Sequence, residues 1–495
     1  MAPYFQNALD MKRHTVPGFA DGWTELPLLA GETCISLSGL HRVCSQVAAV
    51  RRPSTLAMCE PVEVPRRTIP VIGDSKVYVG RGLLALLPGE IMSKESGIKA
   101  SRFVIVSDEN VWPLYGKQLL QGFAALPKVT VHDVATSAAK AAAAPFGFAQ
   151  DCFCGDEPIE SSDDGKLVLT YQVPSGEGTK CRGIKAAIED FMLAHRCNRD
   201  TCMLALGGGV VGDLVGYVAA TFMRGVPYVQ IPTSSTAMID SSVGGKTAIN
   251  VPAGKNLIGA FHQPVAVYAD MDLLATLGKR ELVEGIAEAI KMGVIRIPSL
   301  FELLEARPEQ VMGLDPELIE QVMYDSIRGK AEVVNADEKE AGLRGTLNWG
   351  HTIGHAIEAL KSPAMMHGEC VAVGCVAEAE VAMRLGRDDM NLDAAKVKRI
   401  TDCFASYGLP IHVPRGLPLD KLMNKMALDK KNQGNTIRCT IVTDIGVSIV
   451  HPQPVSKQMM QDVMAASMKD GATRPEWEPH AGNHHVAKAG GLMAE

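Results

Sequence analysis

Short apolar runs alternate with helical patterns through the first half of the chain, beginning near residue 76. The runs 102–108, 201–209 and 228–233 have apolar centres, which is typical of strands that are buried on both faces of a sheet. Residues 184–196 instead repeat apolar side chains at helical spacing. Because strands alternate with helices, the pattern predicts an α/β fold with a mostly parallel sheet.

The pattern changes near residue 272, where long helical stretches replace the alternation. These stretches cover 281–295, 317–334, 350–360 and 368–386, and few strand candidates separate them. The sequence therefore predicts an N-terminal α/β domain over 69–271 and a mainly α-helical domain over 272–468. The remaining segments are an extension of uncertain order at 1–68, a polar surface insertion at about 134–166, and a disordered tail at 469–495.

A polar stripe interrupts one of the predicted helices. Arg344, Asn348, His351 and His355 recur every three or four residues among apolar neighbours, so on one helix they would share a face. A solvated face is the simplest explanation for such a stripe. Buried polar groups need partners, however, and two histidines beside an arginine and an asparagine favour a functional cleft.

Composition excludes several classes of partner. The chain of 495 residues has a formal charge of −7 and no apolar run of membrane-spanning length. We therefore expect neither a nucleic-acid nor a membrane partner. Its 12 cysteines are scattered, which favours a reducing, cytoplasmic location. A plastid address stays open as an alternative, although acidic residues among the first seventy make a poor transit peptide.

Two glycine-rich loops are candidates for holding phosphates. Gly207, Gly209 and Gly212 form GxGxxG after a predicted strand, the context of a Rossmann-like nucleotide-binding domain. The acidic residue expected about twenty positions later is missing. Either the nucleotide is held differently, or the glycines only pack a helix against a strand. The second loop, 238–261, places lysines and asparagines among glycines, which suits an anionic ligand.

A metal site is predicted in the helical domain. Glu288 with His351 and His367 would supply one carboxylate and two imidazoles from three separate elements, a common catalytic zinc set. Lys291 lies three positions after Glu288, on the same helical face. His355 would then be free to hydrogen-bond a ligand or to move protons.

Several motifs in order resemble the 3-dehydroquinate synthase family. They are GGGVVGDLVGYVAATFMRG, DSSVGGKTAINVPAGKNLIGAFHQP, AEAIK, KAEVVNADEKEAGLRGTLNWGHTIGHA, MHGECVAVG and DKKN. The resemblance runs from about residue 71 to 450 and is greatest to the version fused into the multifunctional shikimate-pathway proteins of fungi. It leaves out the extension, the insertion and the tail.

The resemblance implies a homodimeric lyase of aromatic amino acid biosynthesis that uses NAD and zinc, or another divalent metal such as Co²⁺. It would convert 3-deoxy-D-arabino-heptulosonate 7-phosphate (DAHP) to 3-dehydroquinate and phosphate, by transient oxidation, phosphate elimination, re-reduction and aldol closure.

The resemblance also assigns roles to individual residues. By motif, the nucleotide contacts are Asp108, Asn110, Glu177, Lys180, Gly208, Gly209, Asp213, Thr233, Ser234, Lys255 and Thr276. The metal ligands are Glu288, His351 and His367. The substrate residues are Asp240, Lys246, Asn256, Lys291, Lys330, Arg344, Asn348, His355 and Lys430. Arg224 matches an arginine that reaches into the neighbouring subunit's site, which is why we expect a dimer.

One stretch departs from the family. The chain reads PTSSTA at 232–237 where the family usually reads PTTLLA, so Ser235 and Thr236 replace two leucines. This predicts weaker NAD binding or altered packing near the nucleotide. Three alternatives remain: a related cyclase that makes a valiolone or a gadusol precursor, an iron-dependent polyol dehydrogenase, and a catalytically inactive interaction module.

Overall fold

An eight-stranded sheet forms the centre of the N-terminal half in the computed structural model, which describes residues 65–133, 165–427 and 437–468. The strand order is β1-β2-β10-β7-β6-β3-β5-β4, and every neighbouring pair is parallel except β1 with β2. The strands are β1 (Arg66–Pro70), β2 (Lys76–Gly80), β3 (Arg102–Asp108), β4 (Val129–His132), β5 (Lys166–Val173), β6 (Thr201–Gly207), β7 (Tyr228–Pro232) and β10 (Ala266–Asp270).

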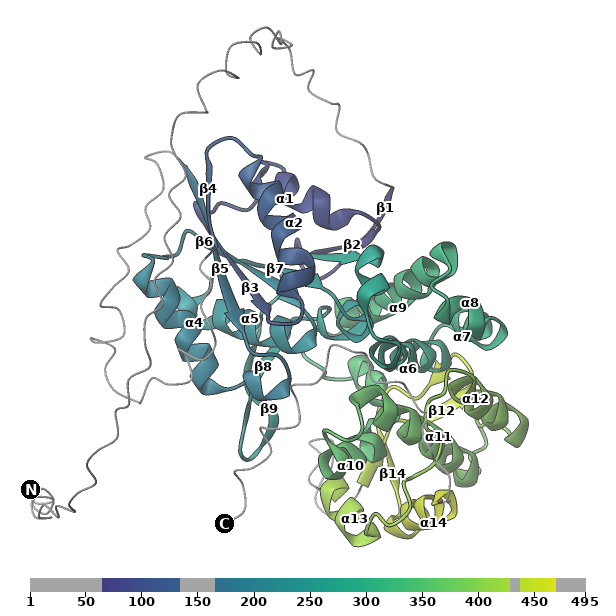
Figure 1. Cartoon of the computed structure of the whole chain (residues 1–495). Coiled ribbons are helices and arrows are strands. Elements are labelled where there is room, and N and C mark those ends of the chain that lie inside the picture. The colour runs from purple at the N-terminus through teal and green to yellow at the C-terminus, as the bar shows by residue number, and fades with distance from the viewer. Residues whose placement is uncertain (1–64, 134–164, 428–436, 469–495) are drawn as a thin grey trace, which may run out of the picture. The chain divides into compact units, whose positions relative to one another are not determined.

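Helices cover both faces of this sheet, as Figure 1 shows. Helices α1 (Leu83–Met92) and α2 (Trp112–Ala124) pack in one apolar cluster with Phe103 and Ile105 of β3. Helices α4 (Arg182–Ala194) and α5 (Gly209–Thr221) pack in a second cluster with the alternate residues Val104 and Val106. Successive side chains of a strand point to opposite faces, so both faces of β3 are buried. The predicted α/β fold class is confirmed.

The predicted strands and helices of this half are found at or near their expected positions. The runs 102–108, 201–209 and 228–233 contain β3, β6 and β7. The helix predicted over 184–196 is α4, which begins and ends two residues earlier. A separate antiparallel hairpin, β8 (Lys246–Val251) with β9 (Gly254–Phe261), carries the second glycine-rich loop. Short helical turns connect these elements: η1 (Glu177–Thr179), η2 (Phe222–Arg224), the π-helical η3 (Ala237–Ser241) and η4 (Met271–Thr276).

The second half of the described chain is mainly helical. Its helices are α6 (Lys279–Ile295), α7 (Pro298–Ala306), α8 (Pro308–Met312), α9 (Pro316–Ala336), α10 (His351–Lys361), α11 (His367–Leu385), α12 (Ala394–Ser406), α13 (Leu419–Ala427) and α14 (Lys457–Ser467). Short strands add two small sheets, β11 (Ile437–Cys439) with β14 (Gln453–Val455) and β12 (Val442–Asp444) with β13 (Val447–Ser448). The four predicted long helices correspond to α6, α9, α10 and α11.

The expectation that the polar stripe lies on one helix is wrong. Arg344 and Asn348 lie in the 3₁₀-helix η5 (Leu343–Asn348), while His351 begins helix α10. Gly350 between them has a φ of 79°, a left-handed conformation that ends one helix and starts the next. Periodicity alone cannot reveal such a break, because both pieces keep nearly helical spacing.

Helices α10 and α11 approach each other closely because glycines face the contact. A Cβ atom on Gly374 would collide with the carbonyl oxygen of Gly350, and one on Gly354 would lie 2.9 Å from the carbonyl oxygen of Cys370. This close approach places the first turn of α10, with His351 and His355, beside His367 at the start of α11.

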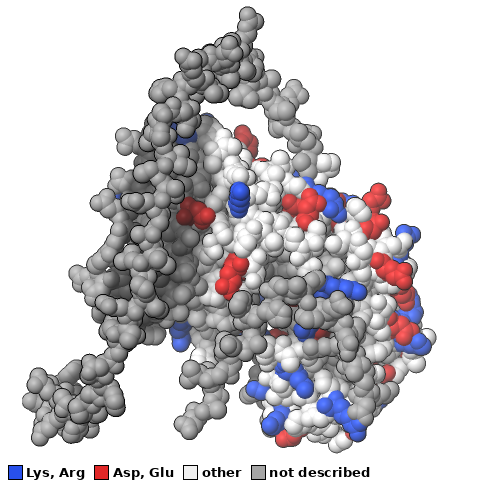
Figure 2. All heavy atoms as spheres, in the orientation of Figure 1, with Lys and Arg blue, Asp and Glu red and all other residues white. Residues whose placement is uncertain are grey.

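The predicted outer segments fall largely outside the described residues. These are the extension through residue 64, the insertion at 134–164 and the tail at 469–495, whereas β1 begins inside the range given to the extension. Among the helices of the described residues, none is long and apolar enough to cross a membrane. On the face shown in Figure 2, basic and acidic side chains are interspersed over the described surface.

Ser235, one of the two residues that differ from the usual family sequence at 232–237, is held by hydrogen bonds to helix α6. Its hydroxyl is buried and donates to the carbonyl oxygens of Glu281 at 2.8 Å and Leu282 at 3.1 Å, in the first turn of α6. The loop after β7 is thereby tied to the helix that carries Glu288. The predicted effect of this departure on NAD binding or on packing stays a prediction.

We predict that Gly285→Ala destabilises the protein by about 1–3 kcal/mol, the usual result of overpacking a core. The new Cβ would collide with the Ser235 hydroxyl and lie 2.7 Å from its backbone carbonyl carbon. Urea unfolding gives the change in free energy. Gly89→Ala is the control, because no atom lies within 4 Å of its Cβ position and alanine favours helix. Equal stability of the two variants would contradict the prediction.

Candidate active site

A pocket of about 220 Å³ lies at the carboxyl ends of the parallel strands. Loops that follow β3, β5, β6 and β7 line it, at the edge where α/β sheets usually bind ligands. Six residues predicted to contact the nucleotide are in its lining: Asp108, Asn110, Gly208, Gly209, Thr233 and Ser234.

The glycines of the first loop divide between lining a pocket and packing a helix against a strand. Gly208 and Gly209 line the pocket, and a Cβ on Gly209 would lie 2.8 Å from the Ser241 hydroxyl. Gly212 instead packs α5 against β7, since its Cβ would collide with Gln230. The loop is therefore able to bring backbone N–H groups close to a phosphate while the third glycine holds helix against strand.

The next three predicted nucleotide contacts form a polar network. Lys180 is buried, pairs with Asp213 and donates to the Asn256 side chain at 2.5 Å. Burial raises the pKa of Asp213, and Lys180 acts against that shift. Asn250 joins Glu177 to this group by donating to its carboxylate at 2.7 Å. The structure thus brings Asn256, which the resemblance placed with the substrate, to the nucleotide-side lysine.

Two further predicted nucleotide contacts lie apart from this pocket lining. Thr276 is bonded to the Tyr115 hydroxyl, and Lys255 on β9 pairs with Glu358 of α10 at 2.8 Å. Lys255 therefore connects the hairpin with the helical half of the chain.

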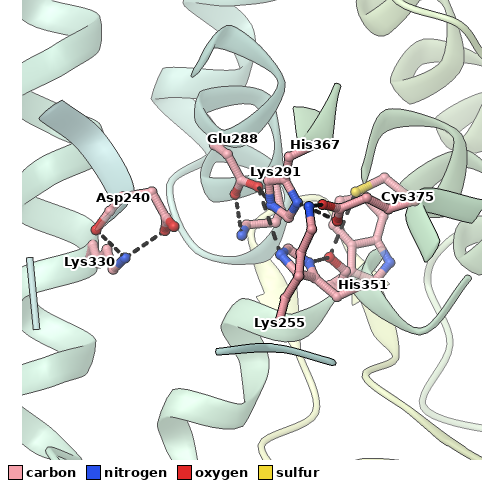
Figure 3. Close-up of polar contacts among 10 residues, drawn as sticks. Asp240, Lys255, Glu288, Lys291, Lys330, His351, His367 and Cys375 are labelled. Atoms are coloured by element: carbon pink, nitrogen blue, oxygen red, sulfur yellow. Dashed lines mark hydrogen bonds and ion pairs between the residues drawn. The ribbon is translucent and has the colours of Figure 1, made fainter. Parts of the chain in front are cut away.

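Three histidines and one glutamate converge in the helical half. Figure 3 shows Glu288 with two of these histidines, His351 and His367. The ring nitrogens of His351, His355 and His367 that could bind a metal lie within 4.8 Å of one another. Glu288 Oε1 lies 3.8 Å from His351 Nε2 and 3.4 Å from His367 Nε2. The predicted ligand set is thus assembled, and His355 lies as close to it as the two predicted imidazoles do.

The charges in this cluster suit a divalent cation. Burial acts to raise the pKa of Glu288, but Lys291 and His367 outweigh it and hold that pKa low, so the carboxylate is ionised. Both its oxygens are buried without a well-directed hydrogen bond among the described residues. Burial, Lys291 and the other histidines lower the pKa of His351, leaving a neutral imidazole. Burial acts to lower the pKa of His367, but Glu288 and Glu358 outweigh it and raise that pKa, so this ring would have to lose a proton to bind a metal. An ionised carboxylate with neutral imidazoles is the donor set that zinc and cobalt prefer, and Glu288 and His351 already have these forms.

A second group of charged side chains lies beside the cluster. Lys330 of α9 pairs with Asp240 of η3 at 2.5 Å, and Figure 3 places this pair next to Glu288 and Lys291. Arg344 is only 2% exposed and donates to the backbone carbonyls of Gly244 at 3.0 Å and Glu338 at 2.5 Å. Two cations predicted to contact substrate, Lys330 and Arg344, therefore hold internal acceptors.

Glu340 is a site residue that the sequence reasoning missed. Its carboxylate accepts from Lys246 at 2.7 Å and from the Asn348 amide at 2.8 Å, so it joins two predicted substrate residues. Its φ of 62° is unusual for a residue other than glycine. The available signal was a group of acidic residues directly before Arg344, which reads as solvated surface without knowledge of its partners.

Asp337 shapes the same loop. Its carboxylate accepts from the backbone N–H groups of Ala341 at 2.8 Å, Gly342 at 2.7 Å and Arg344 at 2.9 Å. Burial acts to raise the pKa of Asp337, but these hydrogen bonds outweigh it and lower that pKa. The loop that presents Arg344 is therefore organised around one carboxylate.

Arg224 is not brought into the site of its own chain, and a second predicted residue cannot be placed. Arg224 is exposed in a turn where Met223, Arg224 and Gly225 all have positive φ, and it bonds none of the other predicted residues in the described chain. Lys430 lies outside the described residues.

The sequence matches two profiles that divide the chain at the start of the helical half. The profile described as 3-dehydroquinate synthase N-terminal matches residues 170–284, and its C-terminal counterpart matches 285–432. The chain belongs to the 3-dehydroquinate synthase family. The Glu288 and histidine cluster lies within the second match, and most of the nucleotide pocket lies within the first.

Curated relatives of this family member include fungal proteins that are much longer. The pentafunctional AROM polypeptide of Schizosaccharomyces pombe is 39% identical over 438 residues, which are 83% of this chain and 25% of that protein. The counterpart from Scheffersomyces stipitis is 40% identical over 420 residues, or 80% of this chain and 24% of that protein. The chain thus spans about a quarter of the length of these relatives.

Solved structures share the fold. A 2-deoxy-scyllo-inosose synthase complexed with carbaglucose-6-phosphate, NAD⁺ and Co²⁺ has a TM-score of 0.66 at 21% identity, covering 82% of this chain and 100% of the other. A 2-epi-5-epi-valiolone synthase from Streptomyces hygroscopicus with NAD⁺ and Zn²⁺ bound has a TM-score of 0.64 at 24% identity, with coverage of 79% and 95%. A glycerol dehydrogenase of Schizosaccharomyces pombe has 0.53 at 15%, covering 82% and 91%.

We predict that Asp337→Ala raises the KM for DAHP, the substrate that the family resemblance implies, by about tenfold or more. A lost hydrogen bond to a charged group is worth about 1.5 kcal/mol, or tenfold in affinity, and three are lost here. Steady-state kinetics measures the change, and circular dichroism checks that the fold persists. Asp388→Ala, at an exposed position, is the control. An unchanged KM in the Asp337 variant would show that the loop does not need this carboxylate.

Proposed function

We propose that this chain acts as a 3-dehydroquinate synthase, which converts DAHP to 3-dehydroquinate with release of phosphate. The observation that carries the proposal is the cluster of Glu288 and three histidines, with Lys291 paired to Glu288 and Lys330 paired to Asp240, in a member of this family. A sugar acid phosphate has two anionic groups, and this site offers several cations next to a metal-binding set.

NAD and a divalent metal, zinc or cobalt, are the cofactors of this proposal. The pocket after β3, β5, β6 and β7 would hold the nucleotide, and Glu288, His351 and His367 would hold the metal. When bound, the nucleotide supplies a reversible hydride acceptor and the metal polarises a substrate oxygen. Two solved structures of the same fold hold NAD⁺ together with Co²⁺ or Zn²⁺, which supports this choice of cofactors.

The substrate residues would act by charge and by hydrogen bonding. Arg344 suits the carboxylate, because its guanidinium is already oriented by two backbone carbonyls. Asn348 and His355 would bind the phosphate, and His355 is also placed to move protons among its neighbours. Lys246 and Lys330 neutralise the anions and fix one conformer of the substrate through the successive steps.

The anionic substrate has to displace an internal carboxylate. Glu340 holds Lys246 and Asn348 together in the structure, in the way that a bound phosphate or carboxylate would. Substrate binding would therefore exchange one carboxylate for another at these two side chains, while Asp337 keeps the loop in place.

We predict that the chain turns over DAHP far better than sedoheptulose 7-phosphate, which lacks the carboxylate. Arg344→Ala should lose kcat/KM on DAHP by on the order of a hundredfold, because a hydrogen bond to a charged group contributes up to about 3 kcal/mol. The same change should affect the uncarboxylated sugar much less. Coupled detection of phosphate and of dehydroquinate measures both reactions.

Two outcomes of that assay would contradict the proposal. Equal or better turnover of sedoheptulose 7-phosphate would favour a valiolone-type cyclase. Accumulation of NADH in proportion to product would favour a polyol dehydrogenase, because the proposed reaction regenerates NAD in every turnover.

We also propose a homodimer in which Arg224 completes the partner's site, and a cytoplasmic location. Arg224 is exposed in a turn where Met223, Arg224 and Gly225 have positive φ, which leaves its side chain accessible to a partner subunit. The cysteines that the structure describes are free thiols, which favours a reducing compartment.

We predict that mixing Arg224→Ala with Lys246→Ala restores activity up to about a quarter of wild type. Random exchange makes half the dimers hybrid, and each hybrid would carry one intact site if Arg224 acts across the interface. Activity is measured after exchange is demonstrated with differently tagged subunits. No recovery in exchanged samples would contradict a shared site.

A further inference from the structure

Glu358 joins the proposed metal site to the nucleotide-side hairpin. It lies on α10, one turn beyond His355, and its side chain is only 14% exposed. One carboxylate oxygen lies 3.0 Å from His367 Nδ1, and the other accepts from Lys255 Nζ at 2.8 Å. Both partners therefore use the same carboxylate at the same time.

The contact with His367 fixes which ring nitrogen faces the cluster. An ionised carboxylate accepts hydrogen bonds, so His367 must donate from Nδ1 to Glu358. In the neutral ring this leaves the lone pair on Nε2, the atom that lies 3.4 Å from Glu288. His351 is oriented in a similar way, but by the neutral backbone carbonyl of Trp349 at 3.0 Å. His367 alone of these two has a charged orienting partner.

Lys255 connects Glu358 with a part of the chain outside the histidine cluster. It lies on β9, in the hairpin that belongs to the N-terminal half, and its side chain is 44% exposed. Because the lysine neutralises part of the carboxylate charge, Glu358 polarises His367 less than it would alone. If Lys255 instead bound a nucleotide phosphate, the Glu358 carboxylate would interact with His367 alone. The His367 imidazole would then be a stronger metal ligand.

We propose that Glu358 is a positioning residue that orients His367 for the metal and, through Lys255, links metal binding to nucleotide binding. The inference rests on the proposed use of a metal and NAD by this chain. Metal affinity and NAD affinity should then be coupled, and by linkage each ligand strengthens the other by the same factor.

The first test measures metal affinity without turnover. The full chain is stripped with a chelator and titrated with Co²⁺, following both the affinity and the visible spectrum of the bound ion. Glu358→Gln should weaken binding by about ten- to hundredfold and alter the spectrum, as expected when a ligand loses its orienting partner. Glu305→Gln, which breaks the surface pair with Arg399, is the matched control.

The second test uses Lys255→Met, an exposed position where folding is not at risk. In the wild type, saturating NAD⁺ should tighten Co²⁺ binding by about fivefold or more. In the Lys255 variant, and in a Glu358→Gln Lys255→Met double variant, this factor should fall to near one. The effects of the two substitutions should be non-additive, as expected for residues in contact.

Each outcome decides the inference separately from the proposed function. Wild-type Co²⁺ affinity and spectrum in Glu358→Gln would overturn the orienting role, and an NAD⁺ effect that survives Lys255→Met would overturn the link. Absence of stoichiometric metal in the wild type would overturn both. A chain that passes these tests but makes no dehydroquinate would overturn only the proposed function.

Discussion

The buried carboxylate of Glu288 is the group on which the rest of the site depends. It is 3% exposed on α6, and an ionised carboxylate in such a place costs several kcal/mol unless opposite charges surround it. Lys291 and His367 supply those charges, and Lys291 is also held in its charged form by Asp240. Asp240 in turn pairs with Lys330, so acids and bases alternate from η3 to the histidine cluster. These charges compensate one another only if η3, α6, α9 and the start of α11 lie at fixed distances from one another.

Close backbone contacts make those distances available. A Cβ on Gly244 would lie 2.5 Å from the Arg344 guanidinium, so this glycine leaves the room in which Arg344 bonds to the Gly244 carbonyl. The glycines between α10 and α11 bring the histidines together in the same way, and Gly285 lets Ser235 reach the first turn of α6. Close packing is therefore needed for the electrostatics of the site. If the helices and loops lay further apart, the buried charges would lose their partners.

The sequence predicts most of the strands and helices that carry the site. The features that it does not predict depend on backbone conformation or on contacts between residues far apart in the chain. Apolar periodicity predicts β3, β6 and the long helices, since burial on one or two faces determines it. The broken stripe at Gly350 depends on a left-handed backbone that spacing does not reveal. Glu340 and Glu358 resemble surface charges because their partners, Lys246 and Lys255, lie 94 and 103 positions away. The resemblance supplied roles for family positions, but not these contacts, which only the folded chain brings together.

The cations that we propose to bind substrate already hold internal acceptors, and this bears on how an anion would be recognised. Lys246 bonds to Glu340, Lys330 to Asp240, and Arg344 to two backbone carbonyls. Binding therefore exchanges one set of contacts for another, and affinity is the difference between them. Among these acceptors Glu340 is a side chain in the loop before η5, and its φ of 62° is uncommon for a residue other than glycine. The acceptors of Arg344 are instead backbone carbonyls. An anion that replaces Glu340 gains Lys246 and Asn348 without disturbing Arg344, so recognition at one end of the substrate can proceed while the other end stays preorganised.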